Sequence, residues 1–368
     1  MHNDRRHLLK ALAALAAAPA LAGADEAAAM QFPRDFGAHP GTRLEWWYLT
    51  GLLAEAARPE LPRYGYQLTF FRLLGPARAD HPSRFAARQL LLGHAALSDL
   101  AAGRLRHEQR LARAGFGLAE AAEEDCDVHI EDWRLRRSGT VEQTGYEASF
   151  KAADFALDLR LQRSQPLLLQ GRGGISRKGP APDQFSHYYS QVQLQTAATL
   201  ELDGRRLALQ GRSWLDHEWS DSLLGKQQTA DRAAGWDWLG INLADGGALT
   251  LFRLRRADGS LLWAGGSWCE RGGRTQDLAP DQLRMRPLRH WRSPASGADY
   301  PVEWELQALQ TPLGLLRLRA LIDAQEIDAR RSSGMRYWEG ASELLGADGV
   351  RLGLGYLELT GYAGRLTF

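Results

Sequence analysis

Residues 211–220 place two carboxylates and a histidine between two tryptophans, a combination that is costly to bury unless each polar group finds a partner. In an extended strand, side chains alternate between the two faces. Trp214, Asp216 and Glu218 would then share one face, and His217 and Trp219 would lie on the other. A face that carries two acids beside an indole suits proton transfer, metal binding or a buried polar contact between sheets.

Metal binding would join Asp216 or Glu218 to His94, His187 or His217. The chain contains no His-x-x-x-His pair or other ligand pair of known spacing. We therefore expect no metal site, and no other motif calls for a cofactor. His187 lies beside two tyrosines and suits a ligand pocket, whereas His94 suits either a pocket donor or a hydrogen-bonded core position.

Nucleophilic hydrolysis has little support in the sequence. Residues 174–178 and 211–215 both lack the final glycine of a Gly-x-Ser-x-Gly turn. Cys126 follows three acidic residues, which would raise the pKa of its thiol. Residues 171–180 are rich in glycine and basic side chains but lack the ending of a phosphate-binding loop, so we interpret them as a lid or a connector.

The elements that position these side chains are predicted to be antiparallel strands. Residues 155–162, 64–70 and 302–308 alternate between apolar and polar side chains or between large and small ones. Asp-Gly pairs at 203, 245, 258 and 348 lie between such runs and predict tight hairpins. Residues 115–124 are a weak helical candidate. Many short strands joined by tight turns favour barrels or sandwiches.

Length, composition and charge limit the kinds of protein to which the chain could belong. The 368 residues correspond to about two domains, and 44% hydrophobic with 24% charged residues is ordinary globular composition. The net charge of +1 provides no electrostatic footprint for a nucleic acid. Twelve tryptophans are an excess that concentrates in cores and ligand pockets.

The N-terminus resembles an export signal. Arg5-Arg6 precede an apolar run at residues 11–22, and small residues follow at 27–29. We expect residues 1–29 to be a twin-arginine-type signal peptide and the mature protein to be periplasmic. The apolar run is too short for a permanent membrane span, and no later segment is long enough, so we expect no transmembrane segment in the mature chain.

The strand pattern is interrupted by polar residues between Ser220 and Gly235. We expect one domain over residues 30–224 and a second over residues 225–368. Residues 47–51 and 357–361 are similar in sequence, which favours two related barrels, although five residues can match by chance.

Several motifs occur together in an order that resembles one known family. They are LEWWYLTG at 44–51, KGP at 178–180, SHYYS at 186–190, GRSWLDHEW at 211–219, GWDW at 235–238, YWEG at 337–340 and GYLELTGY at 355–362. In this respect the chain resembles the AttH-like branch of the carotenoid 1,2-hydratase superfamily over nearly all of its mature length.

The resemblance implies an all-β fold of two tandem lipocalin-like antiparallel barrels packed together, with a pocket near their junction. It also implies an apolar ligand, isoprenoid or lipid-like, and an acid-catalysed hydration or isomerisation. Asp216 takes the place of the proposed acid of the hydratases, with Glu218 or His217 as its partner. The ligand-binding candidates are Trp46, Trp47, His94, His187, Tyr188, Trp214, Trp219, Trp236 and Trp238.

Other interpretations of the same residues remain open. Asp216, His217 and Glu218 would also serve as a polar strap between two barrels. Trp338-Glu339 and Tyr356-x-Glu358 are expected to be core and cross-strand pairs. The alternative to an enzyme is a lipid carrier, or an accessory protein of an envelope ABC transporter, since some members of the family are encoded beside ABC-type export machinery.

Overall fold

The computed structural model describes residues 29–75, 77, 80–221 and 232–364. The predicted signal peptide lies almost entirely outside these residues, as does most of the expected boundary between residues 220 and 235. Among the described residues the only helical elements are two 3₁₀ turns, η1 (Arg34–Phe36) and η2 (Pro280–Gln282), and no helix is long and apolar enough to span a membrane.

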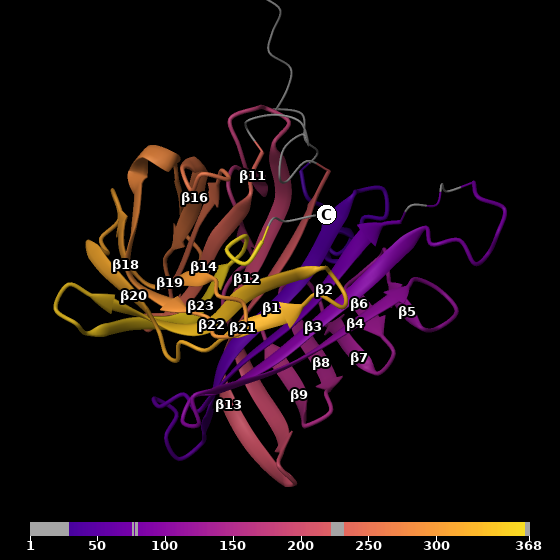
Figure 1. The fold of residues 1–368 in the computed structure, drawn as a ribbon, viewed down its shortest axis with the longest axis horizontal. Helices are drawn as coiled ribbons and strands as arrows, with labels where there is room; N and C mark the ends of the chain where they lie inside the picture. The colour runs from indigo at the N-terminus through magenta and orange to yellow at the C-terminus, as the bar shows by residue number, and fades with distance from the viewer. Residues whose placement is uncertain (1–28, 76, 78–79, 222–231, 365–368) are drawn as a thin grey trace, which may run out of the picture.

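The strands of the chain form two antiparallel sheets (Figure 1). The first contains β1 (Leu44–Glu55), β2 (Tyr64–Leu74), β3 (Gln89–Asp99), β4 (Arg104–Arg113), β5 (Ala119–Ala121), β6 (Asp127–Ile130), β7 (Trp133–Ser138), β8 (Gly145–Lys151), β9 (Phe155–Gln162), β10 (Leu168–Leu169), β11 (Ile175–Arg177), β12 (Phe185–Leu202) and β13 (Arg205–Ser220). The second contains β14 (Gly235–Leu243), β15 (Ala248–Arg255), β16 (Leu261–Cys269), β17 (Thr275–Leu278), β18 (Leu283–Arg292), β19 (Asp299–Ala308), β20 (Leu315–Ala320), β21 (Glu326–Ala329), β22 (Met335–Gly346) and β23 (Arg351–Leu359). Each sheet curls into a barrel or half-barrel, so the predicted fold class, two packed lipocalin-like barrels, is confirmed.

The two sheets share a connectivity. In the first sheet, β1 pairs with both β2 and the last strand, β13. In the second, β14 pairs with both β15 and the last strand, β23. The first strand of each sheet is therefore central, with the second and the last strands on either side of it.

Asp-Gly turns connect neighbouring strands, as the sequence predicts. At Asp203-Gly204, between β12 and β13, both residues have a positive φ, 51° and 72°. This backbone matches the right-handed twist of the strands that it joins. The helical prediction for residues 115–124 is wrong: Gly115 and Phe116 have φ values of 105° and 64°, which end regular structure, and β5 follows.

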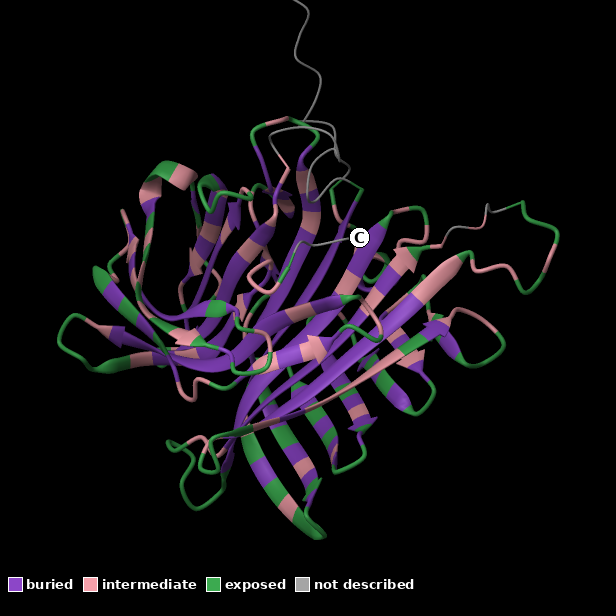
Figure 2. Ribbon diagram, viewed as in Figure 1, coloured by how far each residue is buried: buried purple, intermediate pink, exposed green. Residues whose placement is uncertain are grey.

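The buried side chains of the described residues form several packing clusters. Trp47 and Trp133 lie in the core of the first barrel, and Trp304 and Trp338 lie in the core of the second. A third cluster, which includes Trp214 with residues of both sheets, fills the space between the barrels. Burial is continuous over residues 188–194 of β12 and residues 213–220 of β13, and exposed residues alternate with buried ones toward the turn that joins the two strands (Figure 2). The continuously buried stretches have the first barrel's core on one face and the second sheet on the other.

Candidate functional site

β13 presents its two faces to different regions, because side chains alternate along the strand. His217 and Trp219 point into the environment of the first barrel, and Trp219 belongs to that core. Trp214 belongs to the cluster between the sheets, and Asp216 and Glu218 line a crevice there. Trp214, Asp216 and Glu218 therefore share one face of β13, as the sequence predicts.

A row of side chains crosses the first sheet at Asp216. The strand register places Ser190 of β12, Asp216 of β13, Tyr48 of β1 and Thr69 of β2 side by side. Directly paired residues in an antiparallel sheet project on the same face with Cβ atoms about 5 Å apart. Tyr48 and Asp216 are therefore immediate neighbours on the face toward the second sheet.

A corresponding row crosses the second sheet. Here the register aligns Glu339 of β22, Glu358 of β23, Trp238 of β14 and Phe252 of β15. The two rows occupy equivalent strands of the two sheets, since β13 and β23 are the last strands and β1 and β14 are the first. Asp216 and Glu358 thus have equivalent topological positions.

The crevice lies between these two rows, and its accessible volume is about 70 Å³. Its apolar lining consists of Leu44, Trp46, Phe71, Trp236, Trp238, Phe252 and Leu254. Its polar lining consists of Tyr48, Gln67, Thr69, Lys178, Asp216, Glu218, Tyr337, Glu339 and Glu358. An apolar cavity with a few converging polar groups is typical of a small-molecule site.

Asp216 is 3% exposed and accepts three hydrogen bonds. Ser190 Oγ and Trp214 Nε1 donate to Oδ1 at 2.5 and 2.7 Å, and Tyr188 OH donates to Oδ2 at 2.7 Å. Burial raises the pKa of Asp216 to about 7, while these three donors oppose the rise because they stabilise the carboxylate. Trp238 Nε1 donates in turn to Tyr188 OH at 3.1 Å, which connects Asp216 to the second sheet.

Glu339 is 1% exposed and has far fewer partners. Tyr48 OH donates to its Oε1 at 2.5 Å, and its Oε2 has no partner among the described residues. Burial, and then the charge of the directly paired Glu358, raise the pKa of Glu339 well above its usual value. Glu358 is partly exposed, and its own pKa is raised to about 7, first by burial and then by the charges of Asp216 and Glu218.

Glu218 is held as part of an ion pair. Lys178 Nζ lies 2.9 Å from Glu218 Oε1, and Ser186 Oγ donates to the same oxygen. The ammonium also lies 4.8 and 4.2 Å from the ring centroids of Tyr188 and Phe252. Lys178 directly follows β11, so the glycine-rich segment brings a cation to the crevice, consistent with our interpretation of that segment as a lid or connector.

The structure brings together part of the predicted ligand-binding set. Trp46, Trp236 and Trp238 line the crevice, and Tyr188 and Trp214 contact it through Asp216.

Four predicted residues lie elsewhere. Trp47 and Trp219 are in the core of the first barrel, and His187 stacks on Trp219 with a centroid separation of 5.2 Å. His94 lies between the sheets, where its Nδ1 is 2.9 Å from Tyr337 OH, and burial lowers its pKa to about 3.

The third predicted catalytic residue, His217, faces away from Asp216. Its Nε2 lies 2.9 Å from Glu45 Oε1, and its Nδ1 lies 3.1 Å from Tyr189 OH. Glu45, His217 and His39 form a separate group that could hold a metal ion. The side chain of His217 is therefore not available to the crevice, which leaves Glu218 as the nearer predicted partner of Asp216.

Sequence reasoning missed most of the residues that line the crevice, among them Tyr48, Lys178, Glu339 and Glu358. The two glutamates were expected to be core and cross-strand pairs, and they do pair across β22 and β23. In the sequence, each glutamate lies close to an aromatic residue: Glu339 follows Trp338, and Glu358 lies two residues after Tyr356. On the last two strands of the second sheet they occupy the positions that Ser190 and Asp216 occupy in the first. That equivalence requires the strand order, which the sequence alone does not provide.

Comparison with known proteins gives a consistent result. The family model described as AttH-like matches residues 23–362. A candidate AttH protein from Nitrosomonas europaea, whose crystal structure is known at 2.00 Å, is 41% identical, with a TM-score of 0.81 over 93% of this chain and 100% of that one. Kievitone hydratase from Nectria haematococca is 13% identical, with a TM-score of 0.67 over 93% and 95% of the two chains. The comparison with curated proteins gives no significant match.

Proposed function

This chain belongs to the AttH-like family, and from that premise we propose that it binds an apolar, isoprenoid or lipid-like molecule between its two barrels and hydrates or isomerises a double bond there by acid catalysis. The observation that carries the proposal is Glu339. It is a buried acid in an apolar crevice, and one of its oxygens has no partner among the described residues. Such a setting disfavours the charged form of a carboxyl and keeps a proton available for transfer.

Glu339 and Asp216 suit complementary roles, in which Asp216 is the base and not the acid that the family resemblance implies. Glu339 would protonate one carbon of the double bond, and a carbocation would form at the other carbon. Asp216, which accepts three hydrogen bonds, is the better carboxylate and would take the proton of the water molecule whose oxygen bonds to that carbon. Proton exchange with solvent then restores both groups. For an isomerisation, Asp216 would instead remove a proton from the cation.

The aromatic lining supports a cationic intermediate. Trp46, Trp236 and Trp238 line the same crevice as the two acids. A cation over an aromatic face is stabilised by about 0.5–2 kcal/mol. The ammonium of Lys178 is neutralised by Glu218, so it adds little repulsion toward a passing positive charge.

Two further elements of the proposal come from the sequence and the fold neighbours. One neighbour is named as a hydratase, which agrees with the reaction class at the level of the fold. The twin-arginine-type N-terminus supports a periplasmic location, where envelope lipids would supply the ligand. A carrier, or an accessory protein of an ABC transporter, would use the same crevice without the proton transfer.

The test is a comparison of the wild type with Glu339→Gln and Asp216→Asn. Each protein is incubated with a bacterial envelope lipid extract, and retained molecules and products are measured by mass spectrometry. We expect all three to retain the same ligand, and each variant to form product about 100- to 10,000-fold more slowly, as for the loss of a general acid or base. Glu147→Gln, at an exposed position on β8, is the control and should behave as the wild type.

Retained ligand with no product from the wild type would support a carrier and contradict the enzymatic proposal. The absence of any retained apolar molecule would contradict the binding proposal as well.

A further inference from the structure

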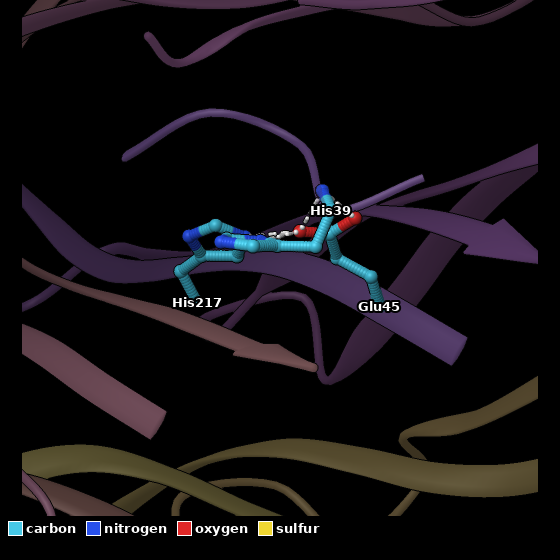
Figure 3. A group of neighbouring side chains, drawn as sticks. All are labelled: His39, Glu45 and His217. Atoms are coloured by element: carbon cyan, nitrogen blue, oxygen red, sulfur yellow. Dashed lines mark hydrogen bonds and ion pairs between the residues drawn. The ribbon is translucent and has the colours of Figure 1, made fainter. Parts of the chain in front are cut away.

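His39, Glu45 and His217 form a group of neighbouring side chains (Figure 3). Alternation along β1 and β13 places Glu45 and His217 on the opposite face of the first sheet from Asp216. His39 lies between η1 and β1, Glu45 is on β1, and His217 is on β13. His39 Nδ1 and His217 Nε2 lie 2.8 and 2.9 Å from the same atom, Glu45 Oε1. The three potential ligand atoms lie within 4.8 Å of one another.

Each of these side chains is oriented by a partner on its far side. Asp35 Oδ1 lies 3.1 Å from the second nitrogen of His39, Nε2. Tyr189 OH lies 3.1 Å from the second nitrogen of His217, Nδ1. The second oxygen of Glu45 accepts from Arg72 Nε at 2.6 Å, in a pair that is fully buried. Outer partners of this kind fix the orientation of metal ligands and are a regular feature of metal sites.

Carboxylate oxygens surround the group. Both ring nitrogens of His39 face them, those of Asp35 and Glu45. The formal charges of Asp35, Glu45 and Arg72 leave a surplus of negative charge around the three potential ligand atoms, which favours a bound cation.

We propose that His39, Glu45 and His217 bind one divalent transition-metal ion of the zinc type, through His39 Nδ1, His217 Nε2 and Glu45 Oε1. Two imidazoles and one carboxylate are a ligand set that zinc uses in proteins. Metal–ligand bonds of about 2.0–2.2 Å in a tetrahedron separate the ligand atoms by about 3.3 Å, so each histidine nitrogen would move about 0.5 Å further from Glu45 Oε1.

The ion would connect the segment after η1 to the first and last strands of the first sheet. At this position, the ion would stabilise the wall of the first barrel. It lies on the face of β13 that carries His217, whereas the crevice lies on the face that carries Asp216. The proposal therefore stands independently of the proposed catalytic function.

The experiment uses the untagged mature protein after treatment with a chelator. Zn²⁺ alone is titrated in by calorimetry, and bound metal is counted by elemental analysis after dialysis. We expect about one equivalent in the wild type, and a characteristic visible absorption spectrum when Co²⁺ replaces Zn²⁺. His39→Ala, at a partly exposed position, is expected to lose this binding, and Asp35→Asn to weaken it by roughly 10- to 100-fold.

His187→Ala is the matched control. His187 and His39 both stack on Trp219, but His187 contacts none of the three ligand atoms. This variant should bind Zn²⁺ as the wild type does. A wild type that binds no Zn²⁺, or a His39→Ala variant that binds it with unchanged affinity, would overturn the proposal and leave the group as a hydrogen-bonded network only.

Discussion

Asp216 and Glu339 are buried to a similar degree and yet have opposite surroundings. Three donors converge on Asp216, whereas Glu339 has a single donor, Tyr48, and the like charge of Glu358 beside it. Hydrogen bonds to a carboxylate favour ionisation, and burial beside another acid disfavours it. The two environments therefore support the proposed roles of Glu339 as the acid and Asp216 as the base.

The raised pKa of Glu339 has a consequence for stability. The pKa is about 4.5 in the unfolded chain and higher in the folded protein, so the unfolded state releases the proton first as the pH rises. The contribution of Glu339 to stability is fully present below pH 4.5 and is lost progressively as the pH rises from there through the raised pKa of the folded protein. Each unit of the pKa shift corresponds to about 1.4 kcal/mol.

Glu339→Gln should remove this loss, because glutamine stays neutral and still accepts a hydrogen bond from Tyr48. Above pH 7 we expect the variant to be more stable than the wild type, and the difference should shrink toward pH 4.5. Urea unfolding from pH 5 to 8 measures it, with the exposed Glu147→Gln as control. An identical pH dependence in Glu339→Gln and the wild type would show that Glu339 ionises normally.

At the scale of elements, the strands explain which features could be predicted. Alternation along residues 211–220 placed Trp214, Asp216 and Glu218 on one face, and the Asp-Gly turns marked hairpins, because both are local properties of the chain. Glu339 reaches the crevice through the packing of one sheet on the other, and Lys178 reaches it through the segment that follows β11; no local pattern encodes either placement. The sequence similarity between residues 47–51 and 357–361 relates β1 to β23. In the structure, β14 has the connectivity of β1, so β14 and not β23 is the equivalent strand.

An irregularity in β12 joins the two sheets. Gln193 has a φ of 56° at a register shift between β12 and β13. Its Nε2 donates to the carbonyl oxygens of Leu243 and Gly247 at 2.8 and 2.6 Å, and its backbone N–H donates to Asn242 Oδ1 at 2.8 Å. The bulge thus directs one side chain of the first sheet into the first hairpin of the second.

Gln193→Ala should weaken the contact between the sheets, because it leaves two buried carbonyl groups without this donor. We expect a loss of about 1–3 kcal/mol in the free energy of unfolding. Gln195→Ala, two residues further along β12 at an exposed position, should cost much less. Chemical denaturation monitored by tryptophan fluorescence compares the two variants. Equal stabilities would contradict the structural role of Gln193.

For the whole molecule, two barrels of like connectivity create a site that neither contains alone. Asp216 and Tyr48 come from the first sheet, and Glu339 and Trp238 come from the second. The site uses the outer faces of the sheets and not the barrel interiors, which are filled by their own cores. Sheet packing therefore controls both the distance between the acids and the space for a ligand.

The most direct test of the account follows the oxygen atom of water. The wild type and Glu339→Gln are incubated with the envelope lipid extract in H₂¹⁸O, and products are analysed by mass spectrometry. If the crevice catalyses hydration, the wild type forms a product that carries one ¹⁸O atom at a newly saturated carbon, and Glu339→Gln forms it at least about 100-fold more slowly. A labelled product formed equally fast by both proteins would contradict the role of Glu339, and the absence of any labelled or isomerised product would contradict the catalytic claim.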